Sequence, residues 1–271
     1  MNYAPVPVRE LAGWQLDDYE FRPKTIDTAK LSKAKHLIAQ RQPFEAATVL
    51  LTEETESLQD SFASLAIRHD LLLEMSRLSW SLGVIDLRPL LAFQRRLYLN
   101  PARQISTKRR DLAALLALSF GEMRPLLCET ARDPATNDLI IRSENANLHV
   151  RHTGNPASPI SIEAGGPFFE VACFQDRWFL RDGYHRAYSL LRAGIFAVPA
   201  VIVEAKTIEE LGAVHPWFFP EDVLFSNAPP RVLDFLDDDL VLSYDRPSLI
   251  KTIRITVEET FTQASPLGEQ L

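Results

Sequence analysis

Residues 177–204 constrain the fold more than any other part of the chain, because they predict three elements in a fixed order. The run RWFLRD is a strand candidate, and it ends in Asp182-Gly183. The residues that follow have apolar side chains at every third or fourth position, until Gly194 ends the pattern. The run AVPAVIVE then indicates a buried strand. We therefore predict a strand, a tight turn, an amphipathic helix and a second strand.

The start of this helix carries residues suited to anion binding. Asp182 is a natural N-cap, which would place Gly183 at the first helical position. The first-turn amides of a helix lack partners within it, and its dipole favours negative charge there. Gly183 lets a ligand approach the backbone, Arg186 suits a bidentate contact with phosphate, and His185 can donate a further bond. The pattern predicts a phosphate site.

A second interpretation of the same residues stays open. Asp182 can serve only as a cap, and its carboxylate would then repel a phosphate. His185 and Arg186 share the polar face of the predicted helix, opposite Tyr184 and its apolar neighbours, so they can also be ordinary solvated residues. The direction in which Arg186 points separates the two interpretations.

The two halves of the chain differ in pattern. Residues 1–24 indicate an extended arm, and helices are expected from Asp27, from Pro43 and over 56–82, 88–99 and 107–120. Beyond Asp133-Pro134, short runs rich in β-branched residues predict strands. These runs are DLIIRS, NLHVRH, PFFEVACF, RWFLRD, AVPAVIVEA and KTIRITVEE. Gln175-Asp176 is expected to close a hairpin. We expect an α+β fold, with an N-terminal helical region (1–134) packed on a mixed α/β domain (135–271).

Composition narrows the possible partners. The net charge of −7 argues against general binding of nucleic acid. No apolar run approaches the ~18 residues of a membrane span, and MNYAPVPVRE lacks the apolar core of a signal peptide. We therefore expect a cytoplasmic protein without a membrane partner. Cys128 and Cys173 are too few and too far apart for a zinc cluster, and they are expected to be buried thiols, with a disulfide as the alternative.

Residues 177–211 resemble the core of the ParB/sulfiredoxin-like superfamily. Its members share a strand, a G-x-H-R or G-x-R-R turn, a helix and a strand opening in V-P or I-P, and this chain has DGYHR and VPAVIVE. The archaeal-type free serine kinases have a similar D-G-H-H-R form. The resemblance implies a bound nucleoside triphosphate with Mg²⁺. It also implies that Gly183, Tyr184, His185 and Arg186 line the nucleotide phosphates.

Departures from the family pattern limit what the resemblance implies. Sulfiredoxin has a nucleophilic cysteine where this chain has Tyr184, and a phenol cannot do thiolate chemistry, so sulfiredoxin activity is not expected. Partition-type ParB proteins carry G-E-R-R and a following helix-turn-helix domain, neither of which is recognisable here. The kinases need a carboxylate base. Asp182 matches the motif's aspartate and is the candidate catalytic residue, whereas Glu163 and Glu170 align with no known base.

Two functions from different classes follow. The first is a protein that binds a nucleoside triphosphate with Mg²⁺, and whether it acts as a phosphotransferase or a nucleotide hydrolase is left open. The alternative is a non-catalytic module for interaction with protein or DNA, with a vestigial or regulatory anion site. In that case the helical region would be the surface for a protein partner. Nucleotide turnover, as opposed to binding alone, separates the two.

Overall fold

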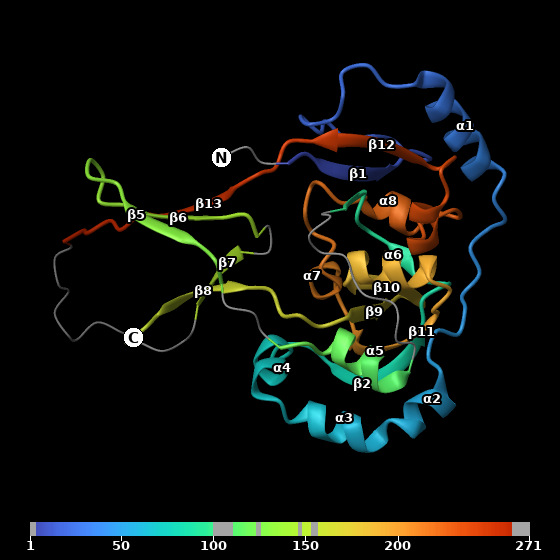
Figure 1. Ribbon diagram of the computed structural model, residues 1–271, viewed down its shortest axis with the longest axis horizontal. Coiled ribbons are helices and arrows are strands. Elements are labelled where there is room, and N and C mark those ends of the chain that lie inside the picture. Colours follow the sequence, from blue (N-terminus) through green and yellow to red (C-terminus); the bar gives the residue numbers. More distant parts are fainter. Residues whose placement is uncertain (1–3, 100–110, 123–125, 146–147, 153–156, 262–271) are drawn as a thin grey trace, which may run out of the picture. The chain divides into compact units, whose positions relative to one another are not determined.

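The computed structural model describes residues 4–99, 111–122, 126–145, 148–152 and 157–261 (Figure 1). The chain forms two compact units. The first comprises residues 1–123 and 166–248, and the second comprises residues 124–165 and 249–271. Both helices and sheets are present, so the fold class is α+β, as expected.

The first unit contains most of the helices and two sheets. Its elements are β1 (Val6–Leu11), α1 (Thr28–Ala39), α2 (Thr52–Ser57), α3 (Gln59–Ala66), α4 (His69–Glu74), β2 (Trp80–Asp86), β3 (Leu91–Ala92), β4 (Arg96–Tyr98), α5 (Leu112–Ser119), β9 (Glu170–Phe174), β10 (Arg177–Asp182), α6 (Tyr184–Arg192), β11 (Ala197–Glu204), α7 (Ile208–Leu211), α8 (Glu221–Leu224), the 3-10 helix η2 (Val232–Leu236) and β12 (Val241–Arg246).

The larger sheet of this unit has the strand order β2-β11-β9-β10-β3. Strands β9 and β10 form the expected hairpin, whose turn places Gln175 and Asp176 at φ of 51° and 58°. Strand β11 runs parallel to β9 and antiparallel to β2. The connection from β10 through α6 to β11 therefore matches the predicted order (Figure 1). The residues expected on the apolar face of α6, which are Tyr184, Ala187, Tyr188 and Leu191, are all buried.

The second sheet has the order β12-β1-β4, and a buried ionic network fixes its central strand. Glu10 of β1 is fully buried. It accepts hydrogen bonds from Arg22 at 2.6 and 2.8 Å, from Arg96 at 2.9 Å and from the Tyr244 hydroxyl at 2.8 Å. Burial raises the pKa of Glu10, but these partners outweigh it and hold the pKa below its ordinary value. Within the expected N-terminal arm (1–24), the segment Val6–Leu11 is a strand paired with β12 and β4.

The second unit is built from strands. Its elements are β5 (Glu129–Arg132), β6 (Leu139–Ser143), β7 (Leu148–His152), β8 (Ile160–Ala164) and β13 (Lys251–Ile255). Strands β13, β6 and β5 form one antiparallel sheet in that order, and β7 pairs with β8. The strands expected from DLIIRS, NLHVRH and KTIRITVEE are confirmed.

The expected helical region contains strands as well as helices. The helix expected over 56–82 is replaced by α2, α3 and α4 followed by β2, and the helix expected over 88–99 is replaced by β3 and β4. The segment after Pro43 is irregular. Gly83, the residue after the expected helix, lies within β2 opposite Ala200 of β11, and a Cβ there would lie 2.8 Å from the Ile202 side chain. The expected division after residue 134 differs from the observed one, because β2 and β3 pair with β11 and β10.

The N-caps of two helices and the exposure of the two cysteines bear on the remaining expectations. Asp27 caps α1, its carboxylate accepting from the Lys30 amide at 3.0 Å, which confirms that N-cap. The helix expected over 107–120 is described only from Asp111, the N-cap of α5. The prediction for the cysteines was wrong, since Cys128 is exposed and Cys173 is partly exposed, and both are free thiols.

Candidate functional site

The turn between β10 and α6 requires glycine. Gly183, and not Asp182 as expected, is the N-cap of α6, and its φ of +100° lies in the left-handed region. A Cβ on Gly183 would lie 2.8 Å from Cδ2 of Phe169. The Asp182 carboxylate accepts from the Gly183 amide at 2.6 Å, and no side chain caps the helix at its N-cap. The turn thus leaves the first-turn backbone of α6 without a capping side chain.

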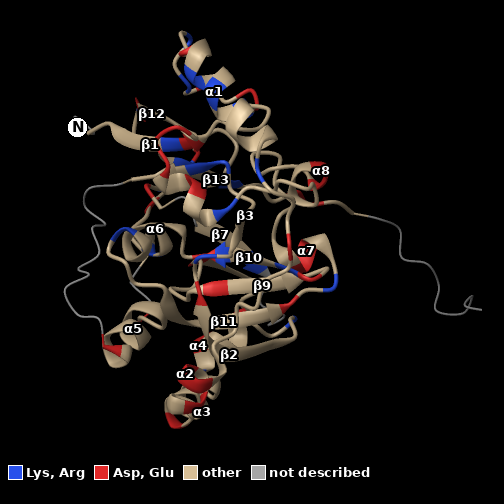
Figure 2. Cartoon of the chain, turned by 90° about the vertical axis from the view of Figure 1, so that its right-hand side faces the viewer, with Lys and Arg blue, Asp and Glu red and all other residues tan. Residues whose placement is uncertain are grey.

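A pair of carboxyl groups lies beside this turn. Glu170 of β9 and Asp182 of β10 are register partners, because the strand pairing shifts between Leu180 and Asp182. Glu170 is buried and forms an ion pair with Arg181. Burial raises the pKa of Glu170 to about 7, with Asp182 contributing and Arg181 opposing. Burial also raises the pKa of Asp182, against the opposing effect of Arg186. Acidic and basic segments lie close together where β9, β10 and α6 meet (Figure 2).

His185 is joined to the second sheet of the unit. Its Nε2 contacts the carbonyl oxygen of Tyr98 in β4. A carbonyl oxygen only accepts, so Nε2 carries the proton and donates in this contact. The ring is partly buried and is not the fully solvated side chain of the second interpretation. The contact ties the start of α6 to β4.

The Arg186 side chain hydrogen-bonds to backbone carbonyl groups of two separate segments. Its guanidinium donates to the carbonyl oxygens of Leu118 at 3.1 Å, Phe168 at 2.6 Å and Pro167. It also lies 5.4 Å from the Phe169 ring centroid. Burial lowers the pKa of Arg186, with nearby carboxylates opposing. The guanidinium thus joins the end of α5 to the segment before β9, and a phosphate contact would require some of these bonds to be released.

Tyr184 is a buried residue of the hydrophobic core. Its hydroxyl accepts from the backbone amides of Phe93 at 3.0 Å and Gln94 at 3.4 Å. Its ring packs edge-on against Phe93 and Phe235. Burial raises the pKa of the phenol. This environment gives Tyr184 a structural role.

The two carboxylates upstream of the motif have different surroundings. Glu163 belongs to β8 of the second unit and pairs with Arg151 at 3.0 Å. Glu170 lies at the site, whereas the sequence had assigned it no role. Counting back from the hairpin turn predicts Glu170 opposite Arg181, and the bulge moves it to Asp182. The register of the hairpin could therefore have placed Glu170 near Arg181 and Asp182 from the sequence.

Comparison with protein-family models, curated proteins and solved structures found no match to this chain. Within the described ranges, no helix has the length and apolar character needed to cross a membrane. Among the same residues, no cluster of three or more histidine, cysteine or acidic side chains is arranged to hold a metal ion.

The raised pKa of Glu170 predicts a pH-dependent stability. The unfolded chain releases this proton near pH 4.5, whereas the folded protein keeps it to about pH 7. The contribution of Glu170 to the free energy of unfolding should therefore be largest below pH 4.5 and fall by up to about 3 kcal/mol as the pH rises through 7. Glu170→Gln stays neutral and should lack this part of the fall in urea titrations at pH 4.5 to 8. Parallel pH profiles for the wild type and Glu170→Gln would contradict the assignment, and Glu163→Gln serves as the control.

Proposed function

We propose that the protein binds a nucleoside triphosphate with Mg²⁺, with the phosphates at the start of α6. The observation that carries the proposal is the left-handed Gly183, which ends β10 and begins α6 without a capping side chain. Backbone amides at a helix start, together with the dipole, favour phosphate groups. The resemblance of DGYHR and the following VPAVIVE to the ParB/sulfiredoxin-like core supports the same interpretation.

Asp182 suits the metal ion of such a complex. Mg²⁺ is held through one or two carboxylates together with substrate phosphates. One oxygen of Asp182 accepts from the Gly183 amide, and no described residue hydrogen-bonds to the other oxygen. A cation held by that oxygen would also offset the repulsion between Asp182 and a phosphate. This oxygen of Asp182 supports the proposal that Mg²⁺ binds together with the nucleotide.

Glu170 is the candidate base if a phosphoryl group is transferred. A general base works best when its pKa lies near the operating pH, and that of Glu170 is raised to about 7. It lies opposite Asp182 across the hairpin. After Glu170 takes up a proton, the carbonyl oxygen of its carboxyl group would still accept a hydrogen bond from Arg181, its ion-pair partner. Phosphoryl transfer otherwise depends on positioning and charge stabilisation, so the acceptor is left open.

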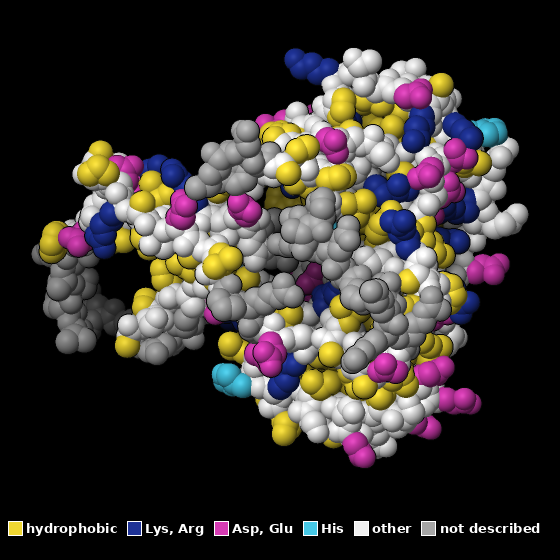
Figure 3. Space-filling model, viewed as in Figure 1, with side chains coloured by type: hydrophobic (Ala, Val, Ile, Leu, Met, Phe, Trp, Pro, Cys, Tyr) yellow, Lys and Arg dark blue, Asp and Glu magenta, His cyan; other side chains and the backbone are white. Residues whose placement is uncertain are grey.

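A second candidate is a non-catalytic interaction module, and two observations favour it. Tyr184, His185 and Arg186 all have intramolecular partners, as expected of a vestigial site. Apolar side chains are exposed on α4 and before it, namely Ile67 (78%), Leu72 (45%) and Leu73 (48%), which suits a protein partner. Figure 3 shows hydrophobic side chains at this part of the surface. Binding without turnover would favour this candidate.

Thermal denaturation tests the proposal. A ligand at about 100 times its dissociation constant should stabilise the folded protein by about 2.7 kcal/mol. We expect ATP, CTP, GTP or UTP to raise the melting temperature at millimolar concentration, more strongly with Mg²⁺ than without it. Asp182→Asn should remove most of the Mg²⁺ dependence, whereas the exposed Asp239→Asn should not. The proposal fails if none of the four nucleotides shifts the melting temperature.

A further inference from the structure

The loop 212–219 between α7 and α8 carries an exposed aromatic pair. The rings of His215 and Trp217 lie parallel, with centroids 4.4 Å apart and an interplanar angle of 9°. Trp217 is 53% exposed, so the indole keeps accessible surface although the imidazole covers one of its faces. The end of the loop is anchored, because the Phe219 amide donates to the Phe93 carbonyl oxygen at 2.8 Å. The loop thus holds a flat aromatic surface at a fixed place.

Sheet register places the end of this loop close to the start of α6. Strands β3 and β10 run parallel, with Leu180 opposite Ala92, so their carboxyl ends lie at the same edge. Continuing this register brings Gln94 level with Asp182, and Gln94 pairs with Phe218 through an isolated bridge. Phe218 is therefore two strand spacings, about 10 Å, from the end of β10.

The beginning of the loop lies at the same place. Arg181, the neighbour of Asp182, donates through Nε to the carbonyl oxygen of Glu210 at 3.3 Å. Gly212, the C-cap of α7, is also close, since a Cβ there would lie 3.6 Å from that nitrogen. Both ends of the loop therefore lie beside the residues that lead into α6.

We propose that the base of the nucleotide stacks on Trp217, an inference that rests on the proposed nucleotide site at the start of α6. About ten bonds of roughly 1.5 Å join the γ-phosphorus to the base, so this path exceeds the ~10 Å between β10 and the loop. An aromatic side chain stacks with any base, because every base has a π-face. The substrate class is therefore nucleoside triphosphates with little discrimination between bases.

Charge around the loop suits the base and not the phosphates. The flanking segments 206–212 and 220–224 carry one cation, Lys206, and four carboxylates, those of Glu209, Glu210, Glu221 and Asp222. Arg95, which donates to the Phe218 carbonyl oxygen at 2.9 Å, adds a second cation, and Arg181 is paired with Glu170. The balance stays negative, which repels phosphates and leaves a neutral base unaffected. The phosphates therefore lie at α6 and the base at the loop.

Calorimetric titration of the full chain with Mg²⁺ tests the proposal with two probes, ATP and inorganic tripolyphosphate. Both carry three phosphate groups, and ATP alone carries a base. We expect ATP to bind at least about fivefold more tightly, since base–aromatic stacking contributes ~1 kcal/mol or more. Equal binding of the two probes would overturn the stacking on Trp217 and leave the phosphate site in place. Absence of binding by both would overturn the stacking and the proposed function together.

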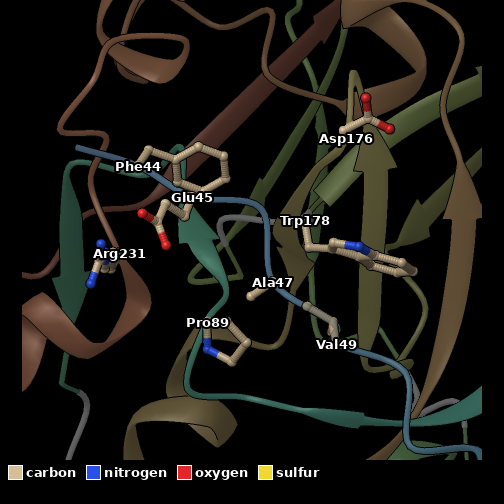
Figure 4. Close-up of a pocket in the computed structure, with 8 residues that line it drawn as sticks. All are labelled: Phe44, Glu45, Ala47, Val49, Pro89, Asp176, Trp178 and Arg231. Atoms are coloured by element: carbon tan, nitrogen blue, oxygen red, sulfur yellow. The ribbon is translucent and has the colours of Figure 1, made fainter. Parts of the chain in front are cut away.

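Tryptophan variants locate the base. Trp217→Leu should weaken ATP binding at least about fivefold and leave tripolyphosphate binding unchanged, which also shows that the variant is folded. Trp178→Leu is the matched control and should change neither, because Trp178 is partly exposed beside a different hollow of about 130 Å³ near the start of β10 (Figure 4).

Three results with these variants would overturn the proposal. The first is unchanged ATP binding by Trp217→Leu. The second is an equal loss of ATP and tripolyphosphate binding by the same variant, which would assign Trp217 to the fold or to the phosphates. The third is a loss of ATP binding by Trp178→Leu, which would place the base in the hollow of Figure 4.

Discussion

Replacement of Gly183 by alanine should lower the free energy of unfolding by about 3 kcal/mol. A left-handed backbone costs an alanine about 1–2 kcal/mol, and overpacking of a filled core adds about 1–3 kcal/mol. Both apply here, since φ is +100° and the new Cβ would lie 2.8 Å from the Phe169 ring. Urea denaturation of the two proteins at one pH measures the difference.

Gly194 provides the matched control for this prediction. It also has a positive φ, +71°, but nothing lies within 4 Å of the Cβ that alanine would add. Gly194→Ala should therefore cost only about 1 kcal/mol, from the backbone conformation alone. Equal losses for the two variants would show that contact with Phe169 does not constrain the β10–α6 turn.

Replacement of Arg186 by alanine should also destabilise the protein, by about 3 kcal/mol. Hydrogen bonds to a charged group contribute about 1.5–3 kcal/mol each, and their loss leaves partly buried carbonyl groups unsatisfied. Three carbonyl oxygens, those of Leu118, Pro167 and Phe168, accept from this side chain. Urea denaturation again provides the measurement.

Arg192 is the control for the same helix. It is exposed and contacts the Tyr188 ring at 5.6 Å, so Arg192→Ala should change stability by about 0.5 kcal/mol or less. If Arg186 instead contacts a phosphate, Arg186→Ala should change stability little and abolish nucleotide binding. That result would contradict a structural role for Arg186 and would support its contact with the phosphates.

The parts of the fold that depend on local pattern were predictable. The helical spacing of Tyr184, Ala187 and Leu191 was enough to identify the buried face of α6, and that face is confirmed. The hairpin at Gln175-Asp176 also depends only on neighbouring residues. Both result from periodicity within one element and from turn chemistry.

Strands formed with distant partners were not predictable in the same way. Residues 80–86 and 91–98 are short segments whose local pattern does not separate helix from strand, and pairing with β11, β10 and β1 sets their state. Likewise, Arg186 bonds to carbonyls such as that of Leu118, far away in the sequence. The motif therefore identified the residues at the start of α6 but not the direction of their side chains.

The most direct test of the nucleotide site is the amide resonance of Gly183. The sequence contains a single Asp-Gly pair, Asp182-Gly183, so labelling with carbonyl-¹³C aspartate and ¹⁵N glycine selects one amide signal. In the free protein this amide donates to the Asp182 carboxylate at 2.6 Å. Phosphates at the start of α6, with Mg²⁺ on Asp182, should shift the signal saturably as the nucleotide is added. The proposed site would be contradicted if the signal stays in place while the nucleotide binds. It would also be contradicted if no nucleotide binds.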